Sequence, residues 1–284
     1  MTVPQTIGVL GGGRMGAGIA HAFLLAGARV QLVERDDESA DAARERVLGS
    51  IATSVKRGDL PDATAVTDSL TVGTDIAAFA GAGLVIEAVP EDRDLKVEAL
   101  TRIEAVLTNE AVLASNTSSI SIDDLAASLS RPDRFLGLHF FNPVPASKLV
   151  ELVVGTRTDA GVVADGRGWV EALGKTPVVV RDSPGFASSR LGVMLGLEAI
   201  RMLEEGVADA ADIDAAMELG YRHPMGPLRT TDVVGLDVRL GIAEELAREL
   251  GPRFEPPTLL RRLVTEGKLG RKSGEGFYVW NEER

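Results

Sequence analysis

Short apolar runs alternate with longer segments whose apolar residues recur every three or four positions, up to about residue 180. A short apolar run is typical of a buried parallel strand, and the longer period is typical of an amphipathic helix. The runs predict strands at residues 6–10, 29–33, 70–72, 84–89, 112–114, 135–139, 149–154 and 177–180. The periodic segments predict helices at 17–26, 37–57, 95–107 and 160–173, with a short helix after Ser121. This alternation predicts an α/β domain with a doubly wound, mostly parallel sheet.

The pattern changes at Asp182-Ser183-Pro184-Gly185, where turn-forming residues coincide with a shift in composition. Beyond this break, strand-like runs almost disappear, and the spacing predicts helices near residues 191–203, 209–219, 235–250 and 257–266. We therefore expect an α/β domain over residues 1–183 and an all-helical domain over residues 184–284.

A glycine-rich turn, Gly11-x-Gly13-x-x-Gly16, joins the first predicted strand directly to the first helix. Dinucleotides bind in this context because the turn brings backbone N–H groups and the helix dipole to the phosphates. The motif alone would also suit an ordinary turn. The second strand, however, ends in Glu34, roughly 20 residues past the glycines, where a carboxylate would hold a ribose 2′-hydroxyl. Together these features predict a Rossmann-like domain that binds a dinucleotide.

The negative charge of Glu34 favours NAD as the cofactor. Glu34 would repel the 2′-phosphate of NADP, since two negative charges would lie close together. The neighbouring Arg35 could soften that preference. We interpret Arg35 as a solvated loop charge, so NAD remains the predicted cofactor.

Composition narrows the class of protein further. The chain has 284 residues with 42 acidic and 30 basic side chains, and its formal net charge of −12 argues against nucleic acid and anionic membranes as partners. The absence of cysteine excludes disulfides, thiolate metal sites and cysteine nucleophiles. The three histidines are scattered, so no metal site is expected. Without a signal-like N-terminus or a long apolar segment, we expect a cytoplasmic protein with no membrane-spanning helix.

Polar residues in the predicted helix 37–57 form a candidate phosphate contact. Ser50, Ser54 and Arg57 lie four and three residues apart on one helix face, and Lys56 lies beside them. The cations would equally suit a solvated helix end, where they complement the helix dipole. The spacing leaves both interpretations open.

Two further candidate regions follow predicted strands, at the edge where open parallel sheets bind ligands. Glu91 and Lys96 lie where the strand 84–89 leads into a helix. A run of polar residues, 115–119, follows the strand 112–114. This run would suit either a plain turn or the hydroxyl-rich floor of a pocket.

Among the histidines, His139 is the best candidate for a general base, because it ends a predicted strand on the side where ligands bind. We expect His21 to be a packing or surface residue and His223 to lie in a loop. Glu151 lies in an otherwise apolar strand, and a buried carboxylate must be paired. Pairing with Glu151 would orient the His139 imidazole and raise its basicity. A purely structural His–Glu bond fits the sequence equally well.

Six motifs resemble those of the L-3-hydroxyacyl-CoA dehydrogenase family, and they span essentially the whole chain. They are Gly-x-Gly-x-Met-Gly-x-Gly-Ile-Ala at 11–20, Ser-Asn-Thr-Ser-Ser at 115–119, His-Phe-Phe-Asn-Pro-Val-Pro at 139–145, Lys-Leu-Val-Glu at 148–151, Ser-Pro-Gly-Phe at 183–186 and Gly-Arg-Lys-Ser-Gly-Glu-Gly-Phe-Tyr at 270–278. The resemblance points to the short-chain, 3-hydroxybutyryl-CoA members.

This resemblance implies roles for individual residues. It makes His139 the catalytic base, Glu151 its partner and Ser118 the serine that touches the substrate hydroxyl. It implies contacts to NAD from Gly11, Gly13, Arg14, Met15, Gly16, Glu34, Glu91, Lys96, Asn116, Asn142 and Lys272. Residues Ser50, Lys56 and Arg57 fall near the family's coenzyme A contacts. Because the family dimerises through its helical domain, the resemblance also implies a homodimer.

One position departs from the family pattern. Where the family has an asparagine that helps hold the substrate carbonyl and the catalytic group, this chain has Ser189. A serine hydroxyl still donates one hydrogen bond, but its side chain is shorter. We expect Ser189 to keep the substrate contact, and the alternative is that it only caps the helix that begins there.

The sequence thus predicts an enzyme of fatty acid metabolism that uses NAD to oxidise an (S)-3-hydroxyacyl-CoA reversibly to the 3-oxoacyl-CoA. The expected substrate is a short-chain one, 3-hydroxybutyryl-CoA. Two alternatives remain open. One is a related dehydrogenase acting on a free hydroxy acid or a carrier-protein thioester, and the other is a non-catalytic NAD-binding protein.

Overall fold

The computed structural model describes residues 2–280, and the chain divides into two compact units between Ser183 and Pro184. The division lies where the change in the hydrophobic pattern placed it. Residue 1 and the last four residues of the expected helical domain, 281–284, lie outside the described part of the chain.

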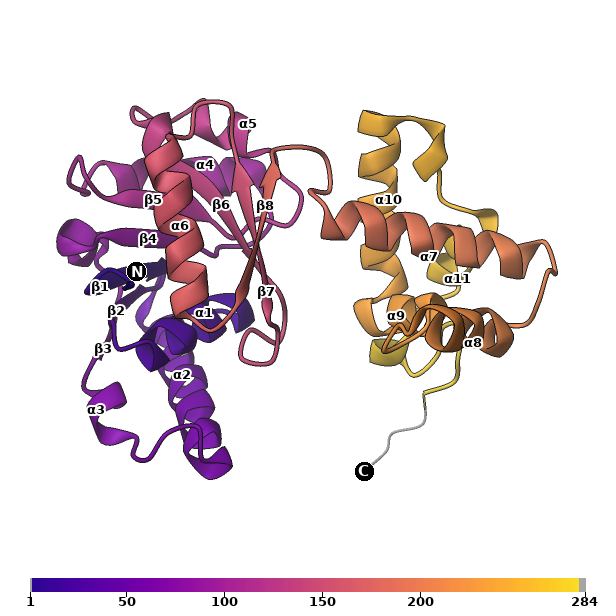
Figure 1. The fold of residues 1–284 in the computed structure, drawn as a ribbon, viewed down its shortest axis with the longest axis horizontal. Helices are drawn as coiled ribbons and strands as arrows, with labels where there is room; N and C mark the ends of the chain where they lie inside the picture. Colours follow the sequence, from indigo (N-terminus) through magenta and orange to yellow (C-terminus); the bar gives the residue numbers. More distant parts are fainter. Residues whose placement is uncertain (1, 281–284) are drawn as a thin grey trace. The chain divides into compact units, whose positions relative to one another are not determined.

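Eight strands of the described first unit form one sheet, in the order β3-β2-β1-β4-β5-β6-β7-β8 (Figure 1). The strands are β1 (Thr6–Leu10), β2 (Arg29–Val33), β3 (Leu70–Gly73), β4 (Leu84–Glu87), β5 (Val112–Ser115), β6 (Phe135–Phe140), β7 (Leu149–Val154) and β8 (Thr176–Arg181). Only β6 and β7 pair antiparallel in this described sheet. The connection between them, residues 141–148, is too short for the crossover that a parallel pair needs. The predicted mostly parallel sheet is confirmed.

Helices cover both faces of the sheet (Figure 1). They are α1 (Arg14–Leu25), α2 (Asp37–Arg57), α3 (Thr64–Thr67), α4 (Arg93–Glu104), α5 (Ile122–Ala126) and α6 (Ala160–Ala172), with short 3₁₀ turns η1 (Ile76–Gly81) and η2 (Pro132–Arg134). Side-chain alternation along β1 shows the two layers. Ile7 and Val9 join the apolar core formed with α1, α2 and α6, whereas Gly8 faces Phe79 of η1. Both faces of the sheet are therefore buried, as its apolar strands require.

The second unit is helical, which confirms the prediction from its periodicity. Its elements are α7 (Ser188–Glu204), α8 (Ala210–Tyr221), α9 (Pro227–Val234), α10 (Leu236–Leu250) and α11 (Thr258–Thr265), with short 3₁₀ turns η3 (Pro252–Phe254) and η4 (Arg271–Ser273). Its core is centred on α7, where Val193, Leu197 and Ile200 recur at helical spacing and are fully buried. No helix among residues 2–280 is both long and apolar enough to cross a membrane.

Candidate active site

The topology brings most of the predicted site residues to one edge of the sheet. The strands β1, β2, β4, β5 and β6 are mutually parallel, so their carboxyl ends meet at that edge. The antiparallel β7 starts at the same edge, which brings Glu151 beside His139. The strand order reverses at β1, and open α/β sheets bind ligands outside the carboxyl ends at such a point.

The glycine-rich turn after β1 has the backbone that a dinucleotide needs. Gly11 has a φ of +93°, a conformation that favours glycine. A Cβ at Gly16 would lie 1.7 Å from the Gly11 carbonyl oxygen, so only glycine lets α1 start this close to the strand. A Cβ at Gly13 would meet nothing within 4 Å, so the backbone there is open to an approaching pyrophosphate. The turn therefore fits NAD.

The carboxylate of Glu34 is held at the position expected for a ribose contact. The Gly12 N–H donates to Glu34 Oε1 at 2.6 Å, which fixes the side chain against the glycine-rich turn. The neighbouring Arg35 is 83% exposed, and its Nε lies 2.9 Å from Asp36 Oδ2. Arg35 is thus paired with Asp36 in solvent, as its interpretation as a solvated loop charge requires.

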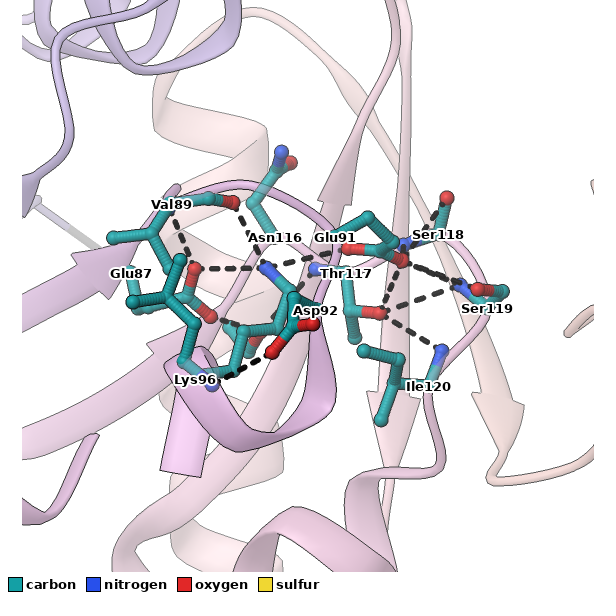
Figure 2. Close-up of polar contacts among 12 residues, drawn as sticks. Glu87, Val89, Glu91, Asp92, Lys96, Asn116, Thr117, Ser118, Ser119 and Ile120 are labelled. Atoms are coloured by element: carbon teal, nitrogen blue, oxygen red, sulfur yellow. Dashed lines mark hydrogen bonds and ion pairs between the residues drawn. The ribbon is translucent and has the colours of Figure 1, made fainter. Parts of the chain in front are cut away.

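A buried ion pair that the sequence analysis missed lies behind this edge (Figure 2). Glu87, at the end of β4, accepts from Lys96 Nζ at 2.8 Å and from the Ser115 hydroxyl at 2.6 Å. Lys96 Nζ also lies 3.3 Å from Glu91 Oε2. The Lys96 ammonium is therefore held between two carboxylates and is fully buried. Lys96 was predicted to contact the cofactor, and in this structure its ammonium is paired with Glu87 and Glu91.

Glu91 organises the polar run 115–119 (Figure 2). Its Oε1 accepts from Thr117 Oγ1 at 2.6 Å and from the backbone N–H of Ser118 at 2.8 Å. Burial raises the pKa of Glu91, but the charge of Lys96 and these hydrogen bonds outweigh burial, so the pKa is lowered overall. Asn116 Oδ1 accepts from the Phe140 N–H at 2.9 Å, which joins the same loop to β6. This run is an anchored loop that positions Ser118, and not a plain turn.

His139 and Glu151 form a buried pair across β6 and β7. They lie directly opposite each other in the antiparallel register, and His139 Nδ1 is 2.8 Å from Glu151 Oε2. His139 is 6% exposed and Glu151 is fully buried. Because a carboxylate only accepts, Nδ1 carries the proton in this bond and Nε2 is the nitrogen suited to accept one. The prediction that the buried Glu151 must be paired is confirmed.

A pocket of about 360 Å³ lies between α1, α2 and the loop after β6, within the first unit. It is lined in part by Arg14, Arg46, Ser50 and Asn142. Arg46 was not predicted, although it lies four residues before Ser50 and shares its helix face. Its guanidinium donates to the Gly12 carbonyl at 3.2 Å. Two arginines and a serine hydroxyl suit this pocket to an anionic ligand.

The expected polar face of α2 is only partly formed. Ser54 is buried, and its hydroxyl lies 3.1 Å from His21 Nε2. It therefore packs between α1 and α2 and does not join Ser50 in the pocket. Lys56 and Arg57 are exposed at the end of the helix. Either a phosphate contact or a solvated helix end is compatible with that position.

Two predicted site residues, Ser189 and Lys272, belong to the second unit. Ser189 is the second residue of α7, whose start has no side-chain cap hydrogen bond, so Ser189 does not cap the helix. Lys272 Nζ lies 2.6 Å from Asp237 on α10. In the described part of the chain, no group of three or more His, Cys, Asp and Glu side chains could hold a metal ion.

The class of protein follows from the first unit. A doubly wound sheet with a dinucleotide turn, an acidic residue at the end of its second strand and a buried His–Glu pair at one edge is typical of an NAD-dependent dehydrogenase. Comparison with known proteins then gives the family. Residues 6–183 match the 3-hydroxyacyl-CoA dehydrogenase NAD binding domain, and residues 185–280 match the C-terminal domain of the same enzymes.

Similar proteins match over nearly the whole chain. A 3-hydroxybutyryl-CoA dehydrogenase from Mycobacterium tuberculosis is 43% identical, covering 97% of this chain and 98% of its own. The mitochondrial hydroxyacyl-coenzyme A dehydrogenase of Homo sapiens is 38% identical, covering 98% and 92%. The crystal structure of (S)-3-hydroxybutyryl-CoA dehydrogenase PaaH1 from Ralstonia eutropha is 40% identical, with a TM-score of 0.94 and coverage of 98% and 100%. The chain belongs to the 3-hydroxyacyl-CoA dehydrogenase family and is an NAD-dependent oxidoreductase.

Proposed function

We propose that this enzyme oxidises short-chain (S)-3-hydroxyacyl-CoA esters, of the size of 3-hydroxybutyryl-CoA, with His139 as the general base. The observation that carries the proposal is the buried His139–Glu151 contact of 2.8 Å at the ligand-binding edge of the sheet. The names of the bacterial relatives support the short acyl chain. An intact pair at this position also disfavours a non-catalytic NAD-binding protein.

In the proposed mechanism, His139 Nε2 takes the proton of the substrate's 3-hydroxyl as the C3–H bond breaks. NAD, when bound, supplies the acceptor for the hydride. Glu151 stabilises the imidazolium that forms, because its carboxylate already accepts from Nδ1. Ser118 holds the substrate hydroxyl, and Glu91 fixes the position of Ser118. In the reverse reaction, the protonated His139 returns its proton to the carbonyl oxygen.

The binding contacts are proposals of the same kind. The turn Gly11–Gly16, including Arg14 and Met15, would hold the NAD pyrophosphate, and Glu34 would hold the adenosine ribose. Glu91, Asn116, Asn142 and Lys272 would complete the cofactor site, with Lys96 acting through Glu91. Ser50, Lys56 and Arg57 would contact the coenzyme A phosphates, and Arg46, which lines the same pocket as Ser50, would join them. The homodimer and the cytoplasmic location stay predictions.

A steady-state assay tests the reaction. Acetoacetyl-CoA should be reduced with NADH, more efficiently than with NADPH, and free acetoacetate should react poorly. His139→Ala should lower kcat by about 10²–10⁴-fold, the usual contribution of general acid–base catalysis, and Glu151→Gln should also lower it. NAD binding, measured by calorimetry, should change little in either variant.

His223→Ala is the matched control, since this histidine lies in the second unit and has no proposed role. It should keep wild-type turnover. A His139 variant with near wild-type kcat would remove this residue from the mechanism. A wild-type preference for free acetoacetate would favour the hydroxy acid dehydrogenase, and NADPH preference would overturn the role of Glu34.

A further inference from the structure

The loop that joins β6 to β7, residues 141–148, is held by a lysine from another part of the first unit. Lys175 directly precedes β8, and its Nζ donates to the carbonyl oxygens of Val144 at 2.6 Å and Ser147 at 2.5 Å. Two backbone hydrogen bonds to the Pro143 carbonyl close the turn inside the loop, but they do not tie it to another element. The ammonium of Lys175 therefore fixes the loop to the start of β8.

The two carbonyls are the partners that this lysine has. Among residues 2–280 no carboxylate pairs with its ammonium, and burial lowers the pKa of Lys175 without an opposing charge. A half-buried cation loses hydration, and its hydrogen bonds must compensate for that loss. An apolar side chain of similar length would avoid the loss but would leave both carbonyls without this donor. The position of the loop thus depends on these two bonds.

The same loop forms a wall of the pocket of about 360 Å³. Together with residues of α1 and α2, the pocket is lined by Asn142, Pro143, Val144 and Pro145. Val144 is 2% exposed, and a Cβ at Gly18 of α1 would lie 2.8 Å from Val144 Cβ, so the loop packs closely against the helix backbone. Because the packing is this close, a displacement of the Val144 backbone changes the width of the pocket.

The catalytic pair is held separately from this loop. His139 and Glu151 face each other in the β6–β7 ladder, and their 2.8 Å contact lies outside residues 141–148. Phe141, at the start of the loop, contacts the His139 ring with centroids 4.4 Å apart, but Lys175 binds further along the loop. A looser loop would therefore leave proton transfer intact and would weaken the binding of a ligand in the pocket.

We propose that Lys175 is a positioning residue for substrate binding. By holding the carbonyls of Val144 and Ser147, it sets the width of the pocket that takes the coenzyme A part of the substrate. The inference rests on the proposed function, which places coenzyme A phosphates beside Ser50 and Arg46 in this pocket. All of these residues belong to the first unit. Lys175 touches neither the substrate nor the reacting atoms, and it acts through the loop.

The test compares two substrates with the full-length enzyme and NADH. One is acetoacetyl-CoA, and the other is S-acetoacetyl-N-acetylcysteamine, which carries the same acyl thioester without the phosphates and the nucleotide. Lys175→Met should raise KM for acetoacetyl-CoA by about five- to tenfold, the loss expected for about one net hydrogen bond, with kcat within about twofold of the wild type. Its kcat/KM for the truncated thioester should stay close to the wild-type value. Lys175→Arg keeps N–H donors and should recover most of the KM.

Hydrogen exchange reports on the loop directly. The amides of Ala146 and Ser147 donate to the Pro143 carbonyl, and their exchange should be faster in Lys175→Met, whereas exchange in the sheet should stay as in the wild type. Unchanged exchange of these two amides would overturn the inference, because the loop would then not depend on Lys175. If Lys175→Met does not fold, the same measurements on Lys175→Gln decide, since its shorter side chain cannot reach both carbonyls either.

Lys148→Met is the matched control, since Lys148 is an exposed lysine of the same loop and its loss removes the same charge. It should keep the wild-type KM for both substrates. An equal rise of KM in Lys148→Met would assign the effect to charge alone and overturn the inference. A wild-type KM in Lys175→Met, or an equal fall of kcat/KM for both substrates, would overturn it as well. A wild type that turns over neither substrate overturns the proposed function instead.

Discussion

At the scale of single residues, Ser189 is the position where the family resemblance led us to expect an asparagine. It lies in the first turn of α7, where backbone N–H groups and the helix dipole favour negative charge. The structure removes one alternative, since α7 begins without a side-chain cap hydrogen bond. Among the described residues the Ser189 hydroxyl has no partner, so it is available to a substrate oxygen.

Ser189→Ala should therefore change kinetics and not stability. We expect kcat/KM for the acyl-CoA to fall. The fall should correspond to a rise of about 1–2 kcal/mol in the activation free energy, which is the order of the contribution of one hydrogen bond. The melting temperature should stay within the error of calorimetry, because no cap bond is lost. Both quantities are measured on one purified variant. Loss of stability with normal kinetics would contradict the substrate contact and restore the capping role.

Two buried carboxylates show how far the sequence leads at this scale. Glu151 in an apolar strand required a partner, and His139 was predicted and found. Glu87 also lies in an apolar strand, yet its partner Lys96 was assigned to the cofactor. The cost of burying an unpaired charge predicts that a buried acid has a partner, but which residue is the partner depends on how the fold brings side chains together. For Glu151, His139 was proposed because it ends the preceding strand, and the family resemblance agreed, whereas nothing in the sequence indicated the partner of Glu87.

At the scale of elements, local signals fixed some boundaries and left others open. The predicted helix 37–57 is α2 itself, because Asp36 caps its start and Gly58 ends it with a φ of +80°. The antiparallel pairing of β7 was not predicted, since an apolar strand reads the same in either direction. α9 was also missed, although Pro227 occupies its first turn, a position that proline favours.

The glycine-rich turn allows a sharp test at this scale, since two of its glycines serve different purposes. Gly16→Ala places a Cβ 1.7 Å from the Gly11 carbonyl oxygen, so α1 must shift from β1. We expect a loss of about 1–3 kcal/mol in the free energy of unfolding, as for overpacked cores, or more because the clash is with backbone. Chemical denaturation measures this loss.

Gly13→Ala is the matched variant, because its Cβ would meet no protein atom within 4 Å. It should keep the stability of the wild type but weaken NAD binding, since the methyl group would occupy the path of the pyrophosphate. Calorimetric titration with NAD measures the change in Kd. Normal NAD affinity in Gly13→Ala would show that the cofactor does not approach the backbone there.

At the scale of the whole molecule, the pH dependence of stability is set by a few groups. The chain carries a formal net charge of −12 and only three histidines. As pH falls from 8 to 5, partial neutralisation of this charge reduces self-repulsion and favours the folded state. A buried histidine acts in the opposite direction. His21 is 1% exposed, and it joins α1 to α2 through its contact with Ser54.

Burial lowers the pKa of His21 from 6.5, and this outweighs the opposing charge of Asp59. The unfolded chain therefore binds a proton more readily than the folded one, and stability rises with pH. The contribution of His21 is fully present above pH 6.5 and is lost as pH falls from 6.5 toward the folded pKa. Melting temperatures measured by calorimetry from pH 8 to pH 5 should fall more steeply for the wild type than for His21→Gln, which has no titrating ring. His223→Gln controls for the loss of a histidine and should keep the wild-type slope. Equal slopes for the wild type and His21→Gln would show that His21 is not the group that destabilises the fold in mild acid.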